Sequence, residues 1–163
     1  MIAFPSDTVT PTAAATIAWG RELAAALPPF AILLLEGELG AGKTTLMKGL
    51  AAGWDVAREE DVASPTYTLI HEYRRGPRVL YHLDLYRVAT AQQFETLGLD
   101  DVFAPPPPGE SKLVAVEWGE RLAGRLPSPC LRIKLQTAPA APAAGDGATG
   151  GDEPRRITAA WVG

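Results

Sequence analysis

The chain has 163 residues, of which 47% are hydrophobic and 21% are charged, and its formal net charge is −4. These values are typical of a globular protein of one domain and exclude a disordered chain, a collagen and a coiled coil. The negative net charge argues against a large basic face that binds nucleic acid by itself. A single cysteine excludes an internal disulfide and a cysteine-based zinc site.

No segment for a membrane or for export is visible in the sequence. The longest strongly apolar run, residues 30–35, is too short to span a bilayer. The N-terminus lacks a charged stretch followed by an apolar one. We therefore expect a cytoplasmic protein that does not bind a membrane.

Helices and strands alternate in the first part of the chain. Thr10 followed by Pro11 is typical of a helix start with threonine as the N-cap, and the alanine-rich stretch up to residue 27 suits that helix. Residues 31–36 (AILLLE) form an apolar run between proline and glycine, which favours a buried strand of a parallel sheet. Residues 43–52 predict the next helix.

The middle of the chain predicts a β-hairpin and a short helix. Residues 67–73 and 79–86 are rich in aromatic and branched side chains, and the turn residues 74–77 lie between them. Thr90 and Gln93 have the spacing of a capping box, which would open a short helix.

The last third predicts strands and one long loop. Residues 112–118 (KLVAVEW) favour a second buried strand, whereas the alternation in 131–135 (LRIKL) favours an antiparallel strand with one solvent-exposed face. Residues 137–154 contain no large apolar side chain, so we expect this segment to be disordered, with a last strand over 156–162. Together these elements predict one α/β domain over residues 1–163, with a mixed sheet flanked by helices.

A phosphate-binding motif lies between the first predicted strand and its helix. Residues 37–45 (GELGAGKTT) fit the P-loop pattern G-x-x-x-x-G-K-[ST], whose glycines let backbone N–H groups converge on phosphate oxygens at a helix N-terminus. Lysine brings a positive charge to the β- and γ-phosphates, and the following hydroxyl coordinates Mg²⁺. The motif predicts a P-loop NTPase-like domain. Its candidate nucleotide-binding residues are Gly40, Ala41, Gly42, Lys43, Thr44 and Thr45.

A P-loop site also needs a carboxylate at the end of a neighbouring strand, which holds Mg²⁺ or its water shell. Glu117 follows the apolar run 114–116, and Asp84 follows the less regular run 79–83. One could serve the metal and the other the attacking water, and each could instead cap a helix or pair with an arginine. The tetrapeptide N-K-x-D of many GTPases is absent, which argues against guanine as the base.

Four motifs occur together in a recognisable order. They are 37–45 (GELGAGKTT), 64–67 (SPTY), 81–87 (YHLDLYR) and 116–118 (VEW), and together they resemble the TsaE family over roughly residues 10–120. The resemblance implies an ATPase that needs Mg²⁺ and that acts with TsaB-like and TsaD-like proteins. That complex installs threonylcarbamoyl on adenosine 37 of tRNAs reading ANN codons. ATP hydrolysis would reset it between turnovers, so this chain would meet tRNA only indirectly.

The resemblance also implies roles for individual residues. Thr44 and Glu117 would be the Mg²⁺ ligands, and Asp84 would orient or activate the attacking water. Lys43 and Asp84 are thus the candidate catalytic residues.

Further contacts to the nucleotide are implied in the same way. Residues 64–66 would form a switch-like loop that brings Thr66 near the γ-phosphate, and Trp118 would lie beside the nucleotide. Ala13, near the start of the first helix, would flank the adenine through its backbone. Glu38 replaces the aspartate that is usual in this P-loop, and residues 137–154 match no part of the family pattern.

Two other functions compete with this interpretation. Short P-loop proteins are often small-molecule kinases, which need an acceptor pocket and usually a lid with an arginine. The long segment 137–154 has no arginine before Arg155, which argues against a kinase. The chain could also be a nucleotide-gated binding protein. Turnover rates separate these functions, because P-loop proteins without an arginine finger hydrolyse at about 10⁻⁴ to 10⁻² per second and kinases turn over at about 1 to 100 per second.

Overall fold

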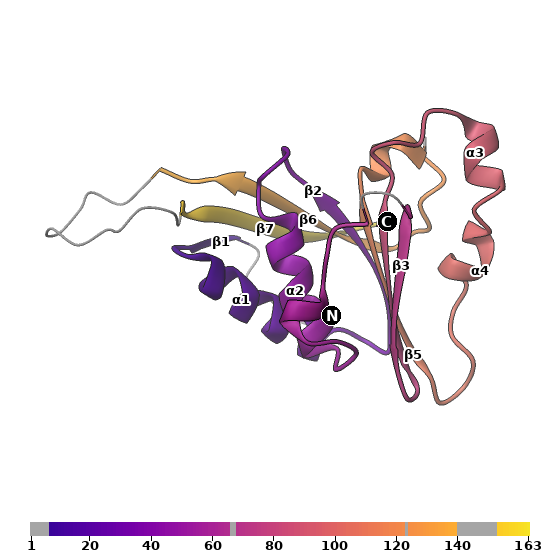
Figure 1. The fold of residues 1–163 in the computed structure, drawn as a ribbon, viewed down its shortest axis with the longest axis horizontal. Helices are drawn as coiled ribbons and strands as arrows, with labels where there is room; N and C mark the ends of the chain where they lie inside the picture. The colour runs from indigo at the N-terminus through magenta and orange to yellow at the C-terminus, as the bar shows by residue number, and fades with distance from the viewer. Residues whose placement is uncertain (1–6, 66–67, 123, 140–152) are drawn as a thin grey trace, which may run out of the picture.

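The computed structural model describes residues 7–65, 68–122, 124–139 and 153–163. Its strands are β1 (Asp7–Thr10), β2 (Phe30–Glu36), β3 (Ile70–Arg75), β4 (Arg78–Asp84), β5 (Ser111–Glu117), β6 (Cys130–Thr137) and β7 (Arg155–Val162). Its helices are α1 (Ala13–Ala26), α2 (Lys43–Gly53), α3 (Ala91–Glu95) and α4 (Leu99–Phe103), with 3₁₀ turns at Glu59–Asp61 and Gly119–Leu122. Figure 1 shows α1 and α2 at one side of the sheet and α3 and α4 at the other.

The seven strands form one mixed sheet in the order β1-β7-β6-β2-β5-β4-β3. Strand β2 is parallel to β5 and β6, and β4 is parallel to β5, whereas β3 and β7 pair antiparallel with their neighbours. The C-terminal ends of four central strands therefore meet at one edge, where ligands of open α/β sheets bind. The predicted α/β fold with a mixed sheet and a hairpin is confirmed.

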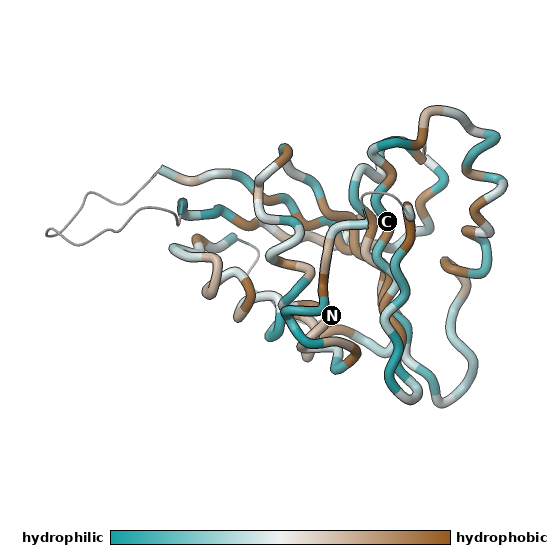
Figure 2. Tube along the Cα trace, in the orientation of Figure 1, coloured by the Kyte–Doolittle hydropathy of each residue, from teal (hydrophilic) through white to brown (hydrophobic). Residues whose placement is uncertain are grey.

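The central strands are buried on both faces. Leu33 and Leu35 of β2 pack in a cluster with α1 and α2, whereas Ile32 packs in a second cluster with α3, α4 and the residues near them. Hydrophobic colour accordingly runs along the middle of the sheet in Figure 2. Burial on both faces explains why residues 31–35 form a continuous apolar run, which ends at the half-buried Glu36.

The predicted start of the first helix is wrong by two residues. Thr12 is the N-cap of α1, and its Oγ1 accepts a hydrogen bond of 3.1 Å from Ala15 N. Thr10 instead ends β1, an edge strand that the sequence analysis did not predict, and its Oγ1 lies 2.7 Å from Thr16 Oγ1. Strand β1 exists because it pairs with β7, so no signal within the first residues reveals it.

Other local predictions hold with shifted ends. The hairpin forms between β3 and β4, and its turn is Gly76 and Pro77. The capping box opens α3, with a 3.3 Å bond from Gln93 N to Thr90 Oγ1 and a 3.2 Å bond from Thr90 N to Gln93 Oε1. Among the described helices, none has both the length and the apolar character needed to cross a bilayer.

Of the C-terminal predictions, the antiparallel strand with one exposed face over 131–135 is confirmed, and the disordered segment is wrong at Thr137. Strand β6 is antiparallel to β7 as expected, yet it is also parallel to β2 and so lies inside the sheet. Thr137, expected in a disordered segment, is the last residue of β6, and Ala138 N donates to Pro154 O at 2.9 Å. Residues 140–152 of that segment lie outside the described residues.

Helices α1 and α2 approach each other closely at glycines. A Cβ added to Gly49 would lie 2.2 Å from Ile17 O, and one added to Gly20 would lie 2.9 Å from Leu46 O. Since α2 begins in the phosphate-binding motif, this contact also fixes the position of that motif against the sheet.

We expect Gly49→Ala to lower the free energy of unfolding by about 1–3 kcal/mol, because the methyl group must displace the α1 backbone. Intrinsic helix propensity acts in the opposite direction and favours alanine over glycine by about 1 kcal/mol. Urea unfolding followed by circular dichroism measures the difference. A gain in stability would mean that the two helices do not pack as closely as described.

Candidate functional site

A cavity of about 420 Å³ lies at the C-terminal edge of the sheet, between the start of α2 and the ends of β4 and β5. Most of the residues that the sequence analysis selected lie here, although they come from three separate parts of the chain. Those that line it are Gly40, Gly42, Lys43, Thr44, Thr45, Asp84, Glu117 and Trp118. Ser64 and Pro65 of the expected switch-like loop also line this cavity.

The loop before α2 has the geometry of a phosphate cradle. Gly40 and Gly42 have φ angles of 80° and 104°, values that favour glycine. Gly42 is the N-cap of α2 and provides no side chain to accept from the first helical N–H groups. These N–H groups, at the positive end of the helix dipole, are suited to bind an anion.

Lys43 holds its ammonium group inside this loop. Its Nζ donates to Gly37 O at 2.6 Å and to Glu38 O at 3.0 Å, and it lies 5.3 Å from the centroid of the Trp118 ring. The residue is 6% exposed. A positive charge is therefore placed at the cavity wall, where it can pair with a phosphate group.

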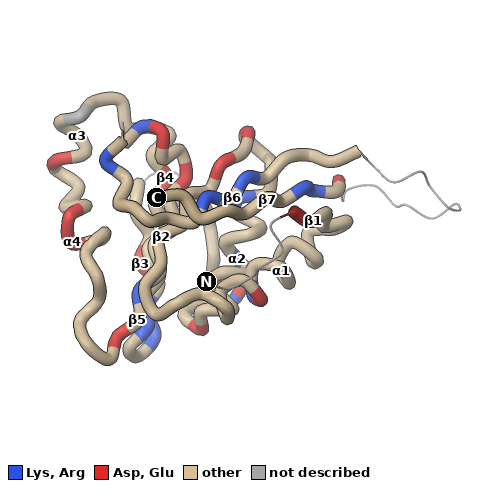
Figure 3. Tube along the Cα trace, turned by 180° about the vertical axis from the view of Figure 1, so that it is seen from behind, with Lys and Arg blue, Asp and Glu red and all other residues tan. Residues whose placement is uncertain are grey.

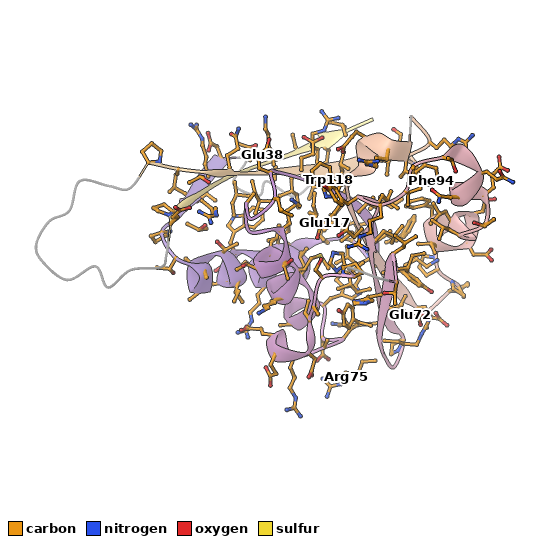
Figure 4. The ribbon with its side chains drawn as sticks, turned by 45° about the horizontal axis from the view of Figure 1, so that its top comes forward. Glu38, Glu72, Arg75, Phe94, Glu117 and Trp118 are labelled. Carbon is orange, nitrogen blue, oxygen red and sulfur yellow. The ribbon has the colours of Figure 1, made fainter. Side chains whose placement is uncertain are left out.

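Two carboxylates stand side by side at the ends of adjacent strands. Asp84 of β4 and Glu117 of β5 are paired in the parallel register. Asp84 Oδ1 accepts from Tyr86 N at 3.0 Å, whereas Glu117 Oε1 lies 2.8 Å from His82 Nε2. Figure 4 shows Glu117 close to Trp118 near the middle of the view. The register explains why two motifs separated by over thirty residues reach the same cavity.

Two residues with left-handed backbone conformations border the cavity. Leu69 has a φ of 57° and Trp118 a φ of 59°, and both line it. Such a conformation costs a non-glycine residue about 1–3 kcal/mol and is concentrated at functional sites. The Trp118 ring packs against Tyr86, with ring centroids 5.0 Å apart. The strained turn after β5 thus keeps an aromatic wall on the cavity.

The donor set suits Mg²⁺ bound together with a phosphate. Among the residues that the structure describes, no group of three or more histidine, cysteine, aspartate or glutamate side chains could hold a metal ion alone. Mg²⁺ usually keeps several waters and binds through one or two carboxylates plus substrate phosphates. The Thr44 hydroxyl and the Glu117 carboxylate, which line the same cavity, fit this mode.

Two of the other selected residues are absent from this lining, and a third lies outside the described residues. Ala13 is the exposed first residue of α1 and is absent from the lining. Ala41 is buried and lines a second hollow that also contains Glu38. Thr66 lies outside the described residues.

The sequence analysis missed several residues of the site. Leu39 and Leu69 line the cavity, as do Tyr86 and Arg87 of the motif 81–87. That motif was a usable signal for the last two residues.

Arg155 is a further missed residue, and no local signal marks it. It belongs to β7, and its Nη2 donates to Gly40 O at 3.3 Å. A Cβ added to Gly42 would lie 3.6 Å from its Nε. The guanidinium group therefore supports the phosphate-binding loop from the far end of the chain.

Comparisons with known proteins point to one family. The family model of the threonylcarbamoyl adenosine biosynthesis protein TsaE matches residues 10–142. The tRNA threonylcarbamoyladenosine biosynthesis protein TsaE of a Synechocystis strain is 46% identical over 70% of this chain and 69% of its own length. The Bacillus subtilis protein of the same name is 39% identical over 96% of this chain and 84% of its own length. The crystal structure of Bacillus subtilis YdiB superposes with a TM-score of 0.69 at 34% identity, over 96% of this chain and 85% of that one. The resemblance of the four motifs is thus confirmed, and the chain belongs to the TsaE family.

Proposed function

We propose that the chain binds ATP with Mg²⁺ in the 420 Å³ cavity and hydrolyses it as an accessory ATPase of tRNA threonylcarbamoyladenosine biosynthesis. One observation carries the proposal: the phosphate-binding loop and two carboxylates paired in register line one cavity. The names of the relatives support the pathway. The ATP hydrolysis, the TsaB-like and TsaD-like partners and the resetting of their complex are our proposal.

Each residue has a role in the proposed reaction. Backbone N–H groups at the start of α2 and the Lys43 ammonium group bind the phosphate oxygens and offset the charge that develops on them. Asp84 orients the water that attacks the γ-phosphate. Thr44 and Glu117 hold Mg²⁺, which when bound supplies positive charge to the β- and γ-phosphates.

The surface charges support an indirect relation to tRNA. Figure 3 shows basic positions along β6 and β7 and at the hairpin end, interspersed with acidic ones. At the hairpin, Arg74 pairs with Glu72 at 2.9 Å and Arg75 with Asp55 at 2.7 Å. The neighbouring carboxylates lower the local positive potential that would attract tRNA, which favours a complex in which the partners hold the tRNA.

ATP turnover by the purified chain tests the proposal. We expect the chain alone to hydrolyse ATP at about 10⁻⁴ to 10⁻² per second. Adding its own TsaB-like and TsaD-like partners and tRNA should stimulate this rate strongly, and a Lys43→Ala variant should show no stimulation. Fast turnover that requires a small-molecule acceptor would instead identify a kinase.

We expect Arg155→Ala to weaken ATP binding about 2- to 10-fold, equally with and without Mg²⁺. The reason is that the variant loses one hydrogen bond to the loop, which contributes about 0.5–1.5 kcal/mol. Isothermal titration calorimetry gives both affinities. Arg156→Ala is the matched control, since Arg156 pairs with Asp7 at the sheet edge, at 2.5 Å, rather than with the loop. Equal losses in the two variants would contradict the role of Arg155.

A further inference from the structure

His82 is a fully buried histidine that the proposed chemistry does not use. It lies in β4, two residues before Asp84, and its exposed fraction is 0%. In the sheet register it stands opposite Ala115, two residues before Glu117 in β5. A β-strand places every second side chain on the same face, so His82, Asp84 and Glu117 share one face of the sheet.

Within the described part of the chain, the imidazole makes one polar contact, and that contact is to a carboxylate. His82 Nε2 lies 2.8 Å from Glu117 Oε1. An ionised carboxylate only accepts hydrogen bonds, so beside an ionised Glu117 the proton is on Nε2. Among the described residues, His82 Nδ1 is buried without a hydrogen-bond partner. In this part of the chain the hydrogen bonding of the ring is therefore directed at Glu117.

Glu117 needs such a partner in order to have one orientation. It is 4% exposed, so water contributes little to solvating its carboxylate. The residue after it is Trp118, which has a left-handed backbone. With Oε1 bound to the imidazole, the second carboxylate oxygen is the one that can serve a cation at the cavity. Hydrogen bonds to a ligating carboxylate fix its orientation and tune metal binding.

We propose that His82 is a positioning residue for Mg²⁺: by donating from Nε2 to Oε1, it holds the Glu117 carboxylate in the orientation that binds the ion. The inference rests on the proposed function, since it assumes that a nucleotide and Mg²⁺ bind in this cavity. It assigns no contact between His82 and the nucleotide or the ion. Substitution of His82 should therefore weaken nucleotide binding in the presence of Mg²⁺ and leave metal-free nucleotide binding unchanged.

The test measures how much Mg²⁺ tightens nucleotide binding. Isothermal titration calorimetry gives the Kd of a non-hydrolysable ATP analogue in EDTA and in Mg²⁺, and their ratio is the readout. We expect His82→Phe, which has a ring of similar size without the donor, to lower this ratio about 10- to 100-fold. The Kd in EDTA should stay unchanged. An unchanged ratio would overturn the positioning role.

Two conservative variants separate positioning from packing and cover the case in which His82→Phe fails to fold. A glutamine amide reaches approximately the position of Nε2, so His82→Gln should retain most of the wild-type ratio of the Kd in EDTA to the Kd in Mg²⁺. An asparagine amide corresponds to Nδ1 instead, so His82→Asn should lower this ratio as His82→Phe does. Equal ratios in these two variants would overturn the proposal. His71→Phe is the control, because His71 is opposite His82 in the adjacent strand and its Nδ1 contacts Tyr73 Oη at 3.3 Å.

A double-mutant cycle shows whether His82 acts through Glu117. In a Glu117→Gln background, His82→Phe should change the ratio little further, since the carboxylate to be positioned is gone. An equal further loss would mean that His82 acts by another route. A wild-type chain that binds no nucleotide in either condition would contradict the proposed function itself. If Mg²⁺ tightens nucleotide binding by the wild type and by the His82 variants equally, only this inference is contradicted.

Discussion

Asp84→Asn should lower the partner-stimulated ATP turnover about 10²- to 10⁴-fold while leaving the Kd for ATP with Mg²⁺ nearly unchanged. Asparagine keeps the oxygen that accepts the 3.0 Å hydrogen bond from Tyr86 N, so the turn after β4 should persist. It loses the negative charge that orients the attacking water. Because the change is nearly isosteric, the effect should appear in kcat and not in binding.

Steady-state turnover with the partner proteins and calorimetric ATP binding check this prediction. The stability of the variant should match that of the wild type in thermal unfolding. Loss of Mg²⁺-dependent ATP binding in this variant, with turnover lost as a consequence, would show that Asp84 holds the metal and that the two carboxylates have exchanged roles. The register alone allows both assignments, since Asp84 and Glu117 end adjacent strands at the same level.

Glu117→Gln should weaken binding of ATP with Mg²⁺ about 100-fold, which is ~2.7 kcal/mol, and should weaken metal-free ATP binding very little. The amide is a poor ligand for a hard cation, which prefers charged carboxylate oxygens. Its carbonyl oxygen can still accept from His82 Nε2, so the fold around the buried side chain should survive.

Calorimetric titrations of ATP in Mg²⁺ and in EDTA give the two affinities. Glu120→Gln is the matched control: Glu120 is exposed in the 3₁₀ turn after β5 and does not line the 420 Å³ cavity. Equal losses in Mg²⁺ and in EDTA would refute the role of Glu117 as a metal ligand.

The two carboxylates differ in burial, and this difference supports their assignment. Glu117 is 4% exposed and bound by an imidazole, whereas Asp84 is half-buried and, within the described part of the chain, accepts a hydrogen bond from the backbone after it. A metal ligand benefits from a fixed orientation, and a group that works on water needs access to solvent. Each predicted result above follows from this division.

The sequence by itself determined the features whose chemistry is local. The phosphate-binding loop could be predicted because its glycines, lysine and threonine are adjacent and lie between an apolar strand and a helix. The buried strands could be predicted because burial on both faces leaves an unbroken apolar run. Asp84 and Glu117 could be selected because each follows such a run, although their separate roles could not be assigned from the residues alone.

Only the tertiary structure decided what depends on distant parts of the chain. Strand β1 forms because β7 pairs with it, and Thr10 is therefore a strand residue and not a helix cap. Arg155 reaches the phosphate-binding loop from β7, more than a hundred residues further along the chain. His82 reads in sequence as one polar residue in a strand, and its bond to Glu117 arises from the parallel register of β4 and β5. Register and strand order are set by packing summed over the whole sheet, so no short window of residues contains them.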